Sequence, residues 1–195
     1  MKEKEIRKLD LQFRAETDEN EKMEIKGYAV VFNSPETYGY TELISDKALE
    51  EADMSDVVLR YNHNDSFMVL ARTRNNSLKL ETDEKGLLMN ATLQDDITEH
   101  KNIFNAIKSG LIDKQSFAFT VEEDNYDYET DTRTILKIGK LFDVSVVDQP
   151  FYNATDVSLA SKNDKFLEKR AELRKQYEEE KALNEAKTKL IEKLG

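Results

Sequence analysis

Three polar side chains stand out because each lies in a segment whose residues otherwise alternate like a β-strand. His63 ends the segment VVLRYNH, Ser116 lies in QSFAFTVEE, and Asp143 lies in LFDVSVVD. Asp is depleted inside strands, and a carboxylate among Leu, Phe and Val needs a charged or hydrogen-bonding partner. A serine, a histidine and an acid on separate strands could perform acyl transfer, because the imidazole takes the hydroxyl proton while the carboxylate holds the imidazole.

From spacing alone this signal is weak, and other interpretations stay open. His63 could be a hydrogen-bonded strand end, Ser116 a small strand residue, and Asp143 the partner of an arginine. Ser145, on the same strand face as Asp143, is a rival nucleophile. We rank it below Ser116 because it lies so close to the acid along one strand that all three groups could not easily converge. The other histidine, His100, is expected to be a surface residue of a helix.

The composition excludes several other kinds of chemistry. The 195 residues include no Cys and two His, which excludes disulfides, thiolate nucleophiles and Cys-ligated metals and leaves too few ligands for a multi-His site. We therefore expect no metal and no cofactor. A net charge of −11 argues against nucleic-acid binding. The sequence has no apolar run of about 18 residues, so we expect no membrane span and a soluble protein acting in a reducing, intracellular space.

The elements that must position these side chains are mostly strands. Period-two patterns separated by polar turns recur at 6–16, 23–32, 57–63, 67–73, 77–83, 86–93, 115–123, 132–140 and 141–148. So many short strands favour a closed or nearly closed antiparallel β-barrel over β-α-β units.

Helical patterns occur at three places. Residues 45–53 begin with Ser45 as a cap, and residues 95–110 end with Gly110 where a C-cap glycine belongs. The tail has no Pro or Gly before its last residue and many Glu-to-Lys/Arg neighbours at helical spacing. Its apolar stripe is thin, which indicates an exposed arm or a partner helix. The sequence thus predicts a mainly β (α+β) domain with flanking helices at 1–160 and a charged helical tail at 161–195.

Four segments in the same order carry a resemblance to a known family. They are KGYAVVFN (26–33), LRYNHN (59–64), KQSFAFTV (114–121) and LFDVSVVDQPFYNAT (141–155). Together they resemble the prohead (capsid-maturation) proteases of tailed bacteriophages, which are similar in fold to the herpesvirus assemblins. The resemblance covers about residues 5 to 160. It departs from the family where NHN replaces the frequent NHD, and where Phe151 replaces the usual small residue after Pro150.

The resemblance implies a serine endopeptidase with an assemblin-like fold. His63 matches the family's catalytic histidine and Ser116 its nucleophile. Asp143 falls where the family commonly has Glu, so it would be the third member with a side chain one methylene shorter. For the oxyanion we expect either backbone N–H groups or an arginine such as Arg72 or Arg74.

The resemblance also implies a place of action and partners. The enzyme would act in the host cytoplasm, inside the immature phage capsid (prohead), and cleave scaffolding segments of the major capsid protein. It would also cut itself and associate with copies of itself. We expect self-cleavage between about residues 156 and 165, best at Ala160–Ser161, which would release the charged helix.

Two other classes of function remain open. One is a non-catalytic capsid assembly or scaffold protein with a β domain and a helical arm. The other is a non-proteolytic hydrolase that uses the same Ser/His pair. Such a hydrolase would normally show a G-x-S-x-G elbow, and Ser116 lies in KQSFA with no glycine beside it.

Overall fold

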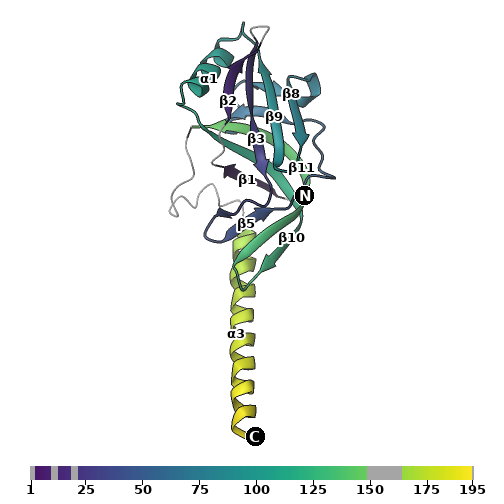
Figure 1. The fold of residues 1–195 in the computed structure, drawn as a ribbon, viewed down its shortest axis with the longest axis vertical. Helices are drawn as coiled ribbons and strands as arrows, with labels where there is room; N and C mark the ends of the chain where they lie inside the picture. Colours follow the sequence, from purple (N-terminus) through teal and green to yellow (C-terminus); the bar gives the residue numbers. More distant parts are fainter. Residues whose placement is uncertain (1–2, 10–12, 19–21, 149–163, 195) are drawn as a thin grey trace.

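The strands form two sheets, with one short helix beside them and one long helix that projects from them (Figure 1). The computed structural model describes residues 3–9, 13–18, 22–148 and 164–194. In this part of the chain, the larger sheet holds β1 (Lys4–Leu9), β4 (Glu36–Thr37), β5 (Thr41–Ile44), β6 (Val58–Tyr61), β7 (Ala71–Arg72), β10 (Lys114–Asp127) and β11 (Thr132–Val147). The smaller sheet holds β2 (Arg14–Thr17), β3 (Met23–Val31), β8 (Leu78–Thr82) and β9 (Gly86–Leu93).

Strand β11 organises the larger sheet. One of its edges pairs antiparallel with β10 along almost the whole hairpin, and β1 pairs antiparallel with the far edge of β10. The other edge of β11 pairs in parallel with two short strands, β5 near its beginning and β6 near its end. Residues 143–146 therefore lie between β10, which carries Ser116, and β6, which leads to His63.

The predicted mainly β fold is confirmed, whereas the predicted antiparallel barrel is wrong. Neither sheet of the described residues closes on itself, and β5 and β6 pair in parallel with β11. The segments 132–140 and 141–148, expected as two strands, form one continuous strand because no turn separates them. Alternating patterns show which side chains share a face, but they contain no information about which edges meet.

The segment 45–53, expected as a helix, forms a series of turns instead. Its main chain bonds to β11: the Ser45 N–H donates to the Ile135 carbonyl over 3.0 Å, and the Ile138 N–H donates to the Ala48 carbonyl over 2.8 Å. Ala48 and Leu49 are buried in the core. Backbone groups used in this way cannot form a helical ladder, so tertiary pairing outweighs local helix propensity here.

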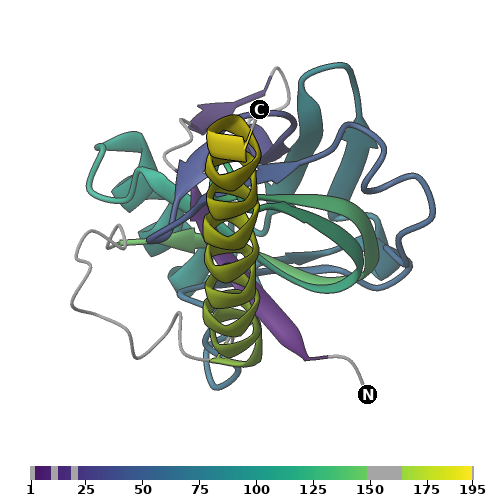
Figure 2. The ribbon, with the colours of Figure 1, turned by 90° about the horizontal axis from the view of Figure 1, so that it is seen from below.

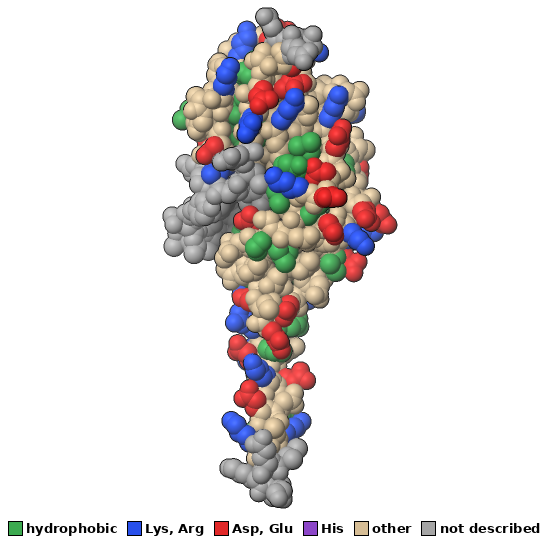
Figure 3. Space-filling view, in the orientation of Figure 1, with side chains coloured by type: hydrophobic (Ala, Val, Ile, Leu, Met, Phe, Trp, Pro, Cys, Tyr) green, Lys and Arg blue, Asp and Glu red, His purple; other side chains and the backbone are tan. Residues whose placement is uncertain are grey.

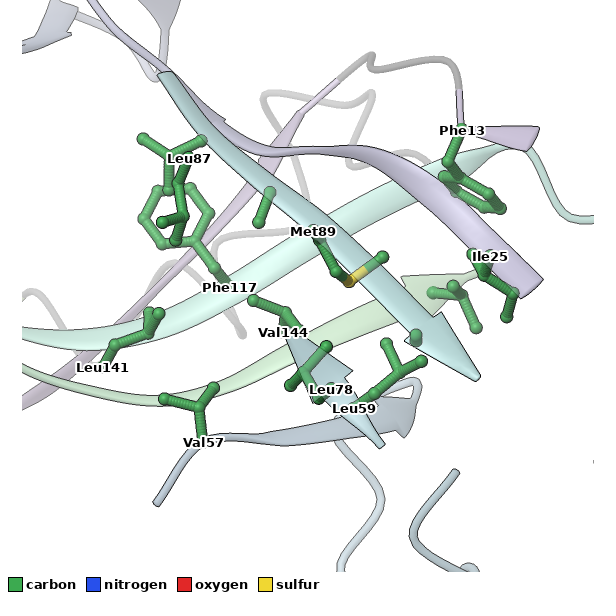
Figure 4. Close-up of a cluster of buried hydrophobic side chains, with 14 of the residues drawn as sticks. Phe13, Ile25, Val57, Leu59, Leu78, Leu87, Met89, Phe117, Leu141 and Val144 are labelled. Carbon is green, nitrogen blue, oxygen red and sulfur yellow. The ribbon is translucent and has the colours of Figure 1, made fainter. Parts of the chain in front are cut away.

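The core lies between the two sheets (Figure 4). Ile25 and Met89 from the smaller sheet and Phe117, Leu141 and Val144 from the larger sheet belong to one buried cluster. Each large apolar side chain buried in this way contributes about 1.5–3 kcal/mol. The alternation that buries Phe117 places Ser116 on the opposite face of β10, away from this core.

Helix α1 (Thr98–Lys108) confirms the helix expected at 95–110, and Gly110 follows it with φ +74°. The expectation of a surface His100 is wrong, because its side chain is buried. His100 lies three and four residues before Ile103 and Phe104, so it belongs to the same buried helix face. Its Nδ1 accepts the Gln94 N–H over 3.1 Å. Another short element, η1 (Thr73–Asn75), follows β7.

The tail forms helix α3 (Asp164–Leu194), as predicted, and its first turns pack against the strands. The Phe166 ring lies 5.1 Å from that of Tyr40, the Arg170 guanidinium pairs with Asp131, and the Tyr177 ring stacks on another tyrosine of the β10–β11 hairpin. Beyond these contacts the helix leaves the body (Figures 1 and 2) with charges of both signs along it (Figure 3). None of the described helices is long and apolar enough to cross a membrane.

Candidate active site

The three predicted site residues come from neighbouring strands of the larger sheet. Ser116 on β10 pairs directly with Ser145 on β11, and Asp143 lies two residues earlier on β11, on the same face. Strand β6 runs along the other edge of β11, with Tyr61 beside Val146. The serine and the acid are therefore diagonal neighbours, and the histidine enters from the next strand.

This register explains why a histidine can link the two groups. Diagonal neighbours across an antiparallel pair lie about 7–8 Å apart, which is too far for Ser116 and Asp143 to bond directly. An imidazole that bonds through both nitrogens fills such a gap. The His63 Nε2 lies 2.6 Å from the Ser116 Oγ, and the His63 Nδ1 contacts the Asp143 Oδ1.

His63 reaches this position through a left-handed turn rather than through the strand alternation that we expected. Strand β6 ends at Tyr61, and Asn62 and His63 have φ of +54° and +52°. Asn and His are among the residue types enriched in this region of backbone space. The Asn62 N–H donates to the Val146 carbonyl over 3.0 Å, and the Tyr61 hydroxyl donates to Asp148 over 2.6 Å. The end of β11 thus holds the turn that carries the imidazole.

The acid is deeply buried and well supported. Asp143 is 2% exposed, and its Oδ2 accepts a hydrogen bond from the Lys4 Nζ over 2.9 Å. Burial alone would raise the pKa of Asp143, but the hydrogen bonds and charges of His63 and Lys4 outweigh it and hold the pKa below its ordinary value. The carboxylate is therefore ionised at neutral pH. Sequence reasoning missed Lys4, because nothing in its local pattern distinguishes it from other strand lysines.

Strand β1 also contacts Ser116. The main chains of Lys8 and Ser116 pair in register, and the Ser116 Oγ lies 2.7 Å from the Arg7 carbonyl oxygen, which can accept its proton. The Ser116 hydroxyl has one proton and two acceptors within reach, namely this carbonyl and the His63 Nε2. Ser116 itself is fully buried.

A buried ion cluster holds β1 to the sheet. The Arg7 guanidinium bonds Glu42, including 2.8 Å from its Nη2 to Oε2, and it also lies 2.6 Å from Glu5. Arg133 bonds the same two carboxylates over 2.8 and 3.1 Å. Burial opposes the charged form of Glu5, but Arg133 and Arg7 bring its pKa below the ordinary value. The Phe166 ring of α3 lies 4.2 Å from the Arg133 guanidinium carbon, so the tail helix covers this cluster.

The structure also tests the remaining sequence-based candidates. Ser145 lies 3.2 Å from the His63 Nδ1 and 3.1 Å from the Asp143 Oδ1, so the expectation that it could not easily converge with them is wrong.

Arg72 makes a two-pronged ion pair with Asp56 over 2.5 and 2.6 Å. It lies three strands from β10, about 14 Å at the usual strand spacing.

Neither expected arginine therefore lies beside Ser116, since Arg74 also pairs with Asp56. The described residues contain no group of three or more His, Asp and Glu that could hold a metal ion. What they do hold is a hydroxyl, an imidazole and an ionised carboxylate in series, which is the arrangement that acyl transfer requires.

A hydroxyl, an imidazole and a carboxylate in series are typical of serine hydrolases, and comparison with known families makes the assignment more specific. The profile of the caudovirus prohead serine protease family matches residues 9–169, and the chain belongs to that family. The resemblance carried by the four sequence segments is thereby confirmed.

A solved structure with a similar fold is that of the capsid assembly protease gp21 of bacteriophage T4. The match has a TM-score of 0.50 and 11% sequence identity, and it covers 74% of this chain and 98% of that one. A search of curated protein sequences finds no match. Membership of the family makes the chain a serine protease of phage capsid maturation.

Proposed function

We propose that Ser116, His63 and Asp143 form the catalytic triad of this prohead protease. The observation that carries the proposal is the unbroken series from the Ser116 Oγ through the two imidazole nitrogens to the Asp143 carboxylate. The Ser116 oxygen attacks the scissile carbonyl while the His63 Nε2 takes its proton. Asp143 accepts a hydrogen bond from the Nδ1–H, keeps its negative charge and stabilises the imidazolium that forms. His63 then protonates the leaving amine, and a water molecule hydrolyses the acyl-enzyme by the same route.

We infer that the substrates are scaffolding segments of the major capsid protein, cleaved inside the prohead in the host cytoplasm. The family's description and the capsid-assembly role named for the T4 protease support this inference. Co-expression with the major capsid protein tests it: the capsid band should shorten with the active enzyme and keep its length with Ser116→Ala. A full-length capsid protein in both cases would leave a non-catalytic assembly role as the better interpretation.

Self-cleavage at Ala160–Ser161 remains part of the proposal, although this bond lies outside the described residues. Helix α3 packs on the body through Phe166 and Arg170, both beyond the proposed cut. A cut alone would therefore leave the helix docked until these contacts break. Intact-mass spectrometry should show the cut in wild type and its absence in Ser116→Ala, and size-exclusion chromatography should show whether the helix stays bound. A wild type that keeps its full mass through assembly would contradict the proposal.

The triad is tested by turnover and by labelling of the nucleophile. Ser116→Ala and His63→Ala should each lower turnover by several orders of magnitude, and the double variant should be little worse, because the groups act as a unit. Asp143→Asn should cost less, and Asp143→Glu should retain much of the activity because the family commonly has Glu there. A fluorophosphonate should label Ser116. Ser109→Ala, on the exposed end of α1, is the matched control and should leave both readouts unchanged.

A further inference from the structure

We propose that Ser145 is a positioning residue that fixes the orientation and tautomer of His63, an inference that rests on the proposed triad. Ser145 is fully buried on β11, directly across from Ser116. The two hydroxyls therefore approach the same imidazole from opposite ends. Ser116 lies 2.6 Å from Nε2, and Ser145 lies 3.2 Å from Nδ1.

The bonds of Ser145 have one consistent set of directions. The main-chain N–H of His63 can only donate, so the Ser145 Oγ accepts it, over 3.2 Å. The carboxylate of Asp143 is ionised and can only accept, so Ser145 donates its proton to Oδ1 over 3.1 Å. The Nδ1–H of His63 donates to the same Oδ1, which closes a ring of hydrogen bonds.

This ring determines which imidazole nitrogen carries the proton. With Ser145 donating to Oδ1, the Nδ1 end of His63 faces an oxygen that can only accept a hydrogen bond, so Nδ1 carries the proton and Nε2 is free to accept from Ser116. The ring also ties the acid to the amide of a residue in the left-handed region, a conformation that non-glycine residues keep only where their surroundings hold them. Ser145 thus connects the backbone of the His63 turn to the side chain that orients the ring.

The same directions explain why Ser145 is poorly placed to be the nucleophile. Its proton goes to a carboxylate with a lowered pKa, which is a weak base, and the nitrogen nearest to it is the protonated Nδ1. Ser116 faces the unprotonated Nε2, which can accept its proton. Ser116 and Ser145 pair across strands but have different roles: Ser116 is the nucleophile, and Ser145 positions the imidazole.

The test measures acylation by a fluorophosphonate in the full-length protein, with kinact and KI determined separately. Ser145→Ala should lower kinact roughly 10- to 100-fold, the range seen when a histidine ligand of a metal loses its orienting partner, and should leave KI unchanged. Ser77→Ala is the matched control, because the Ser77 hydroxyl likewise accepts a backbone N–H, that of Arg72, away from the site. It should leave both constants unchanged.

Nitrogen-15 NMR of the imidazole supplies a readout that does not depend on a variant's folding. The wild type should show His63 with its proton on Nδ1, slowly exchanging with water, and Ser145→Ala should exchange it much faster. A wild type with the proton on Nε2 would overturn the proposal, and so would a Ser145→Ala variant with normal kinact. Label found on Ser145 in an active Ser116→Ala variant would instead refute the proposed triad.

Discussion

Neutralising Glu42 should strongly destabilise the fold, because its carboxylate balances charge where water does not reach. Glu42 is 3% exposed and bonds both Arg7 and Arg133. Together with Glu5 it gives the cluster two buried carboxylates for two guanidinium groups, and the partly exposed Asp124 also bonds Arg133, over 2.6 Å. Glu42→Gln keeps the size of the side chain but leaves two buried cations facing one carboxylate of the pair. Breaking a buried ion pair from one side costs about 3–5 kcal/mol.

The free energy of unfolding is measured by urea denaturation. With a slope of about 2 kcal/mol per molar, a loss of this size lowers the urea midpoint by about 1.5–2.5 M. Glu51→Gln is the matched control: its carboxylate also pairs with a cation, Lys137, but its side chain is 72% exposed. Surface pairs contribute little, so this variant should keep the wild-type midpoint.

A charge-balanced double variant tests whether the loss of stability in Glu42→Gln comes from the unbalanced charge. Arg7→Met combined with Glu42→Met removes one cation and one carboxylate together, and leaves Glu5 paired with Arg133. Replacing a buried pair by apolar side chains of similar volume is often neutral. The double variant should therefore be more stable than Glu42→Gln. A double variant that is less stable, or a Glu42→Gln midpoint equal to that of the Glu51→Gln control, would refute the electrostatic explanation.

Three further predictions concern close packing, the acid and the tail. Gly86→Ala should cost about 1–3 kcal/mol or more in a urea titration, because a Cβ there would lie 2.0 Å from the Val30 carbonyl oxygen; an unchanged midpoint would contradict this. The folded-state pKa of Asp143 is lowered, so its stabilisation is complete above about pH 4 and is lost as the pH falls through the lower folded value. The urea midpoint should thus fall more steeply below pH 4 in wild type than in Asp143→Asn, and equal slopes would exclude this contribution. Phe166→Ala should speed amide hydrogen exchange in the first turns of α3 and leave exchange in β10 and β11 unchanged; uniform protection would show that the ring does not anchor the helix.

The sequence predicts the strands well because the alternation of side chains is local, and it predicts the sheets poorly because edge pairing is not local. The patterns at 77–83 and 86–93 became β8 and β9 almost unchanged. The short strands β4 and β5 have too few residues to show a period, yet β5 pairs with the first four of the 16 residues of β11. Whether a sheet closes depends on such short strands, so the strand patterns could not show that the predicted barrel does not form.

The candidate site shows the same division between local and non-local information. Ser116 and Asp143 could be found because each breaks an apolar pattern, and their faces follow from the alternation. The position of His63 depends on two left-handed residues whose φ values no alternation predicts. The immediate neighbours of His100 are polar and indicate a surface residue, whereas its spacing from Ile103 and Phe104 places it on the buried face of α1. A helix face is defined by residues three and four apart rather than by adjacent ones.

The contacts of β1 make the beginning and the end of the chain part of one support for the site. Lys4 bonds Asp143, the Arg7 carbonyl lies 2.7 Å from the Ser116 Oγ, and the Arg7 guanidinium bonds the ion cluster that Phe166 of α3 covers. Most of these groups are buried, so they have few other hydrogen-bonding partners if one of these contacts is lost. Strand β1 therefore cannot shift along β10 without moving a bonding partner of both Asp143 and Ser116. The two registers act together. The pairing of β10 with β11 sets the distance between Ser116 and Asp143 that the imidazole spans. The pairing of β1 with β10 places the Arg7 carbonyl beside Ser116 and Lys4 beside Asp143, where both compete with the imidazole for hydrogen bonds.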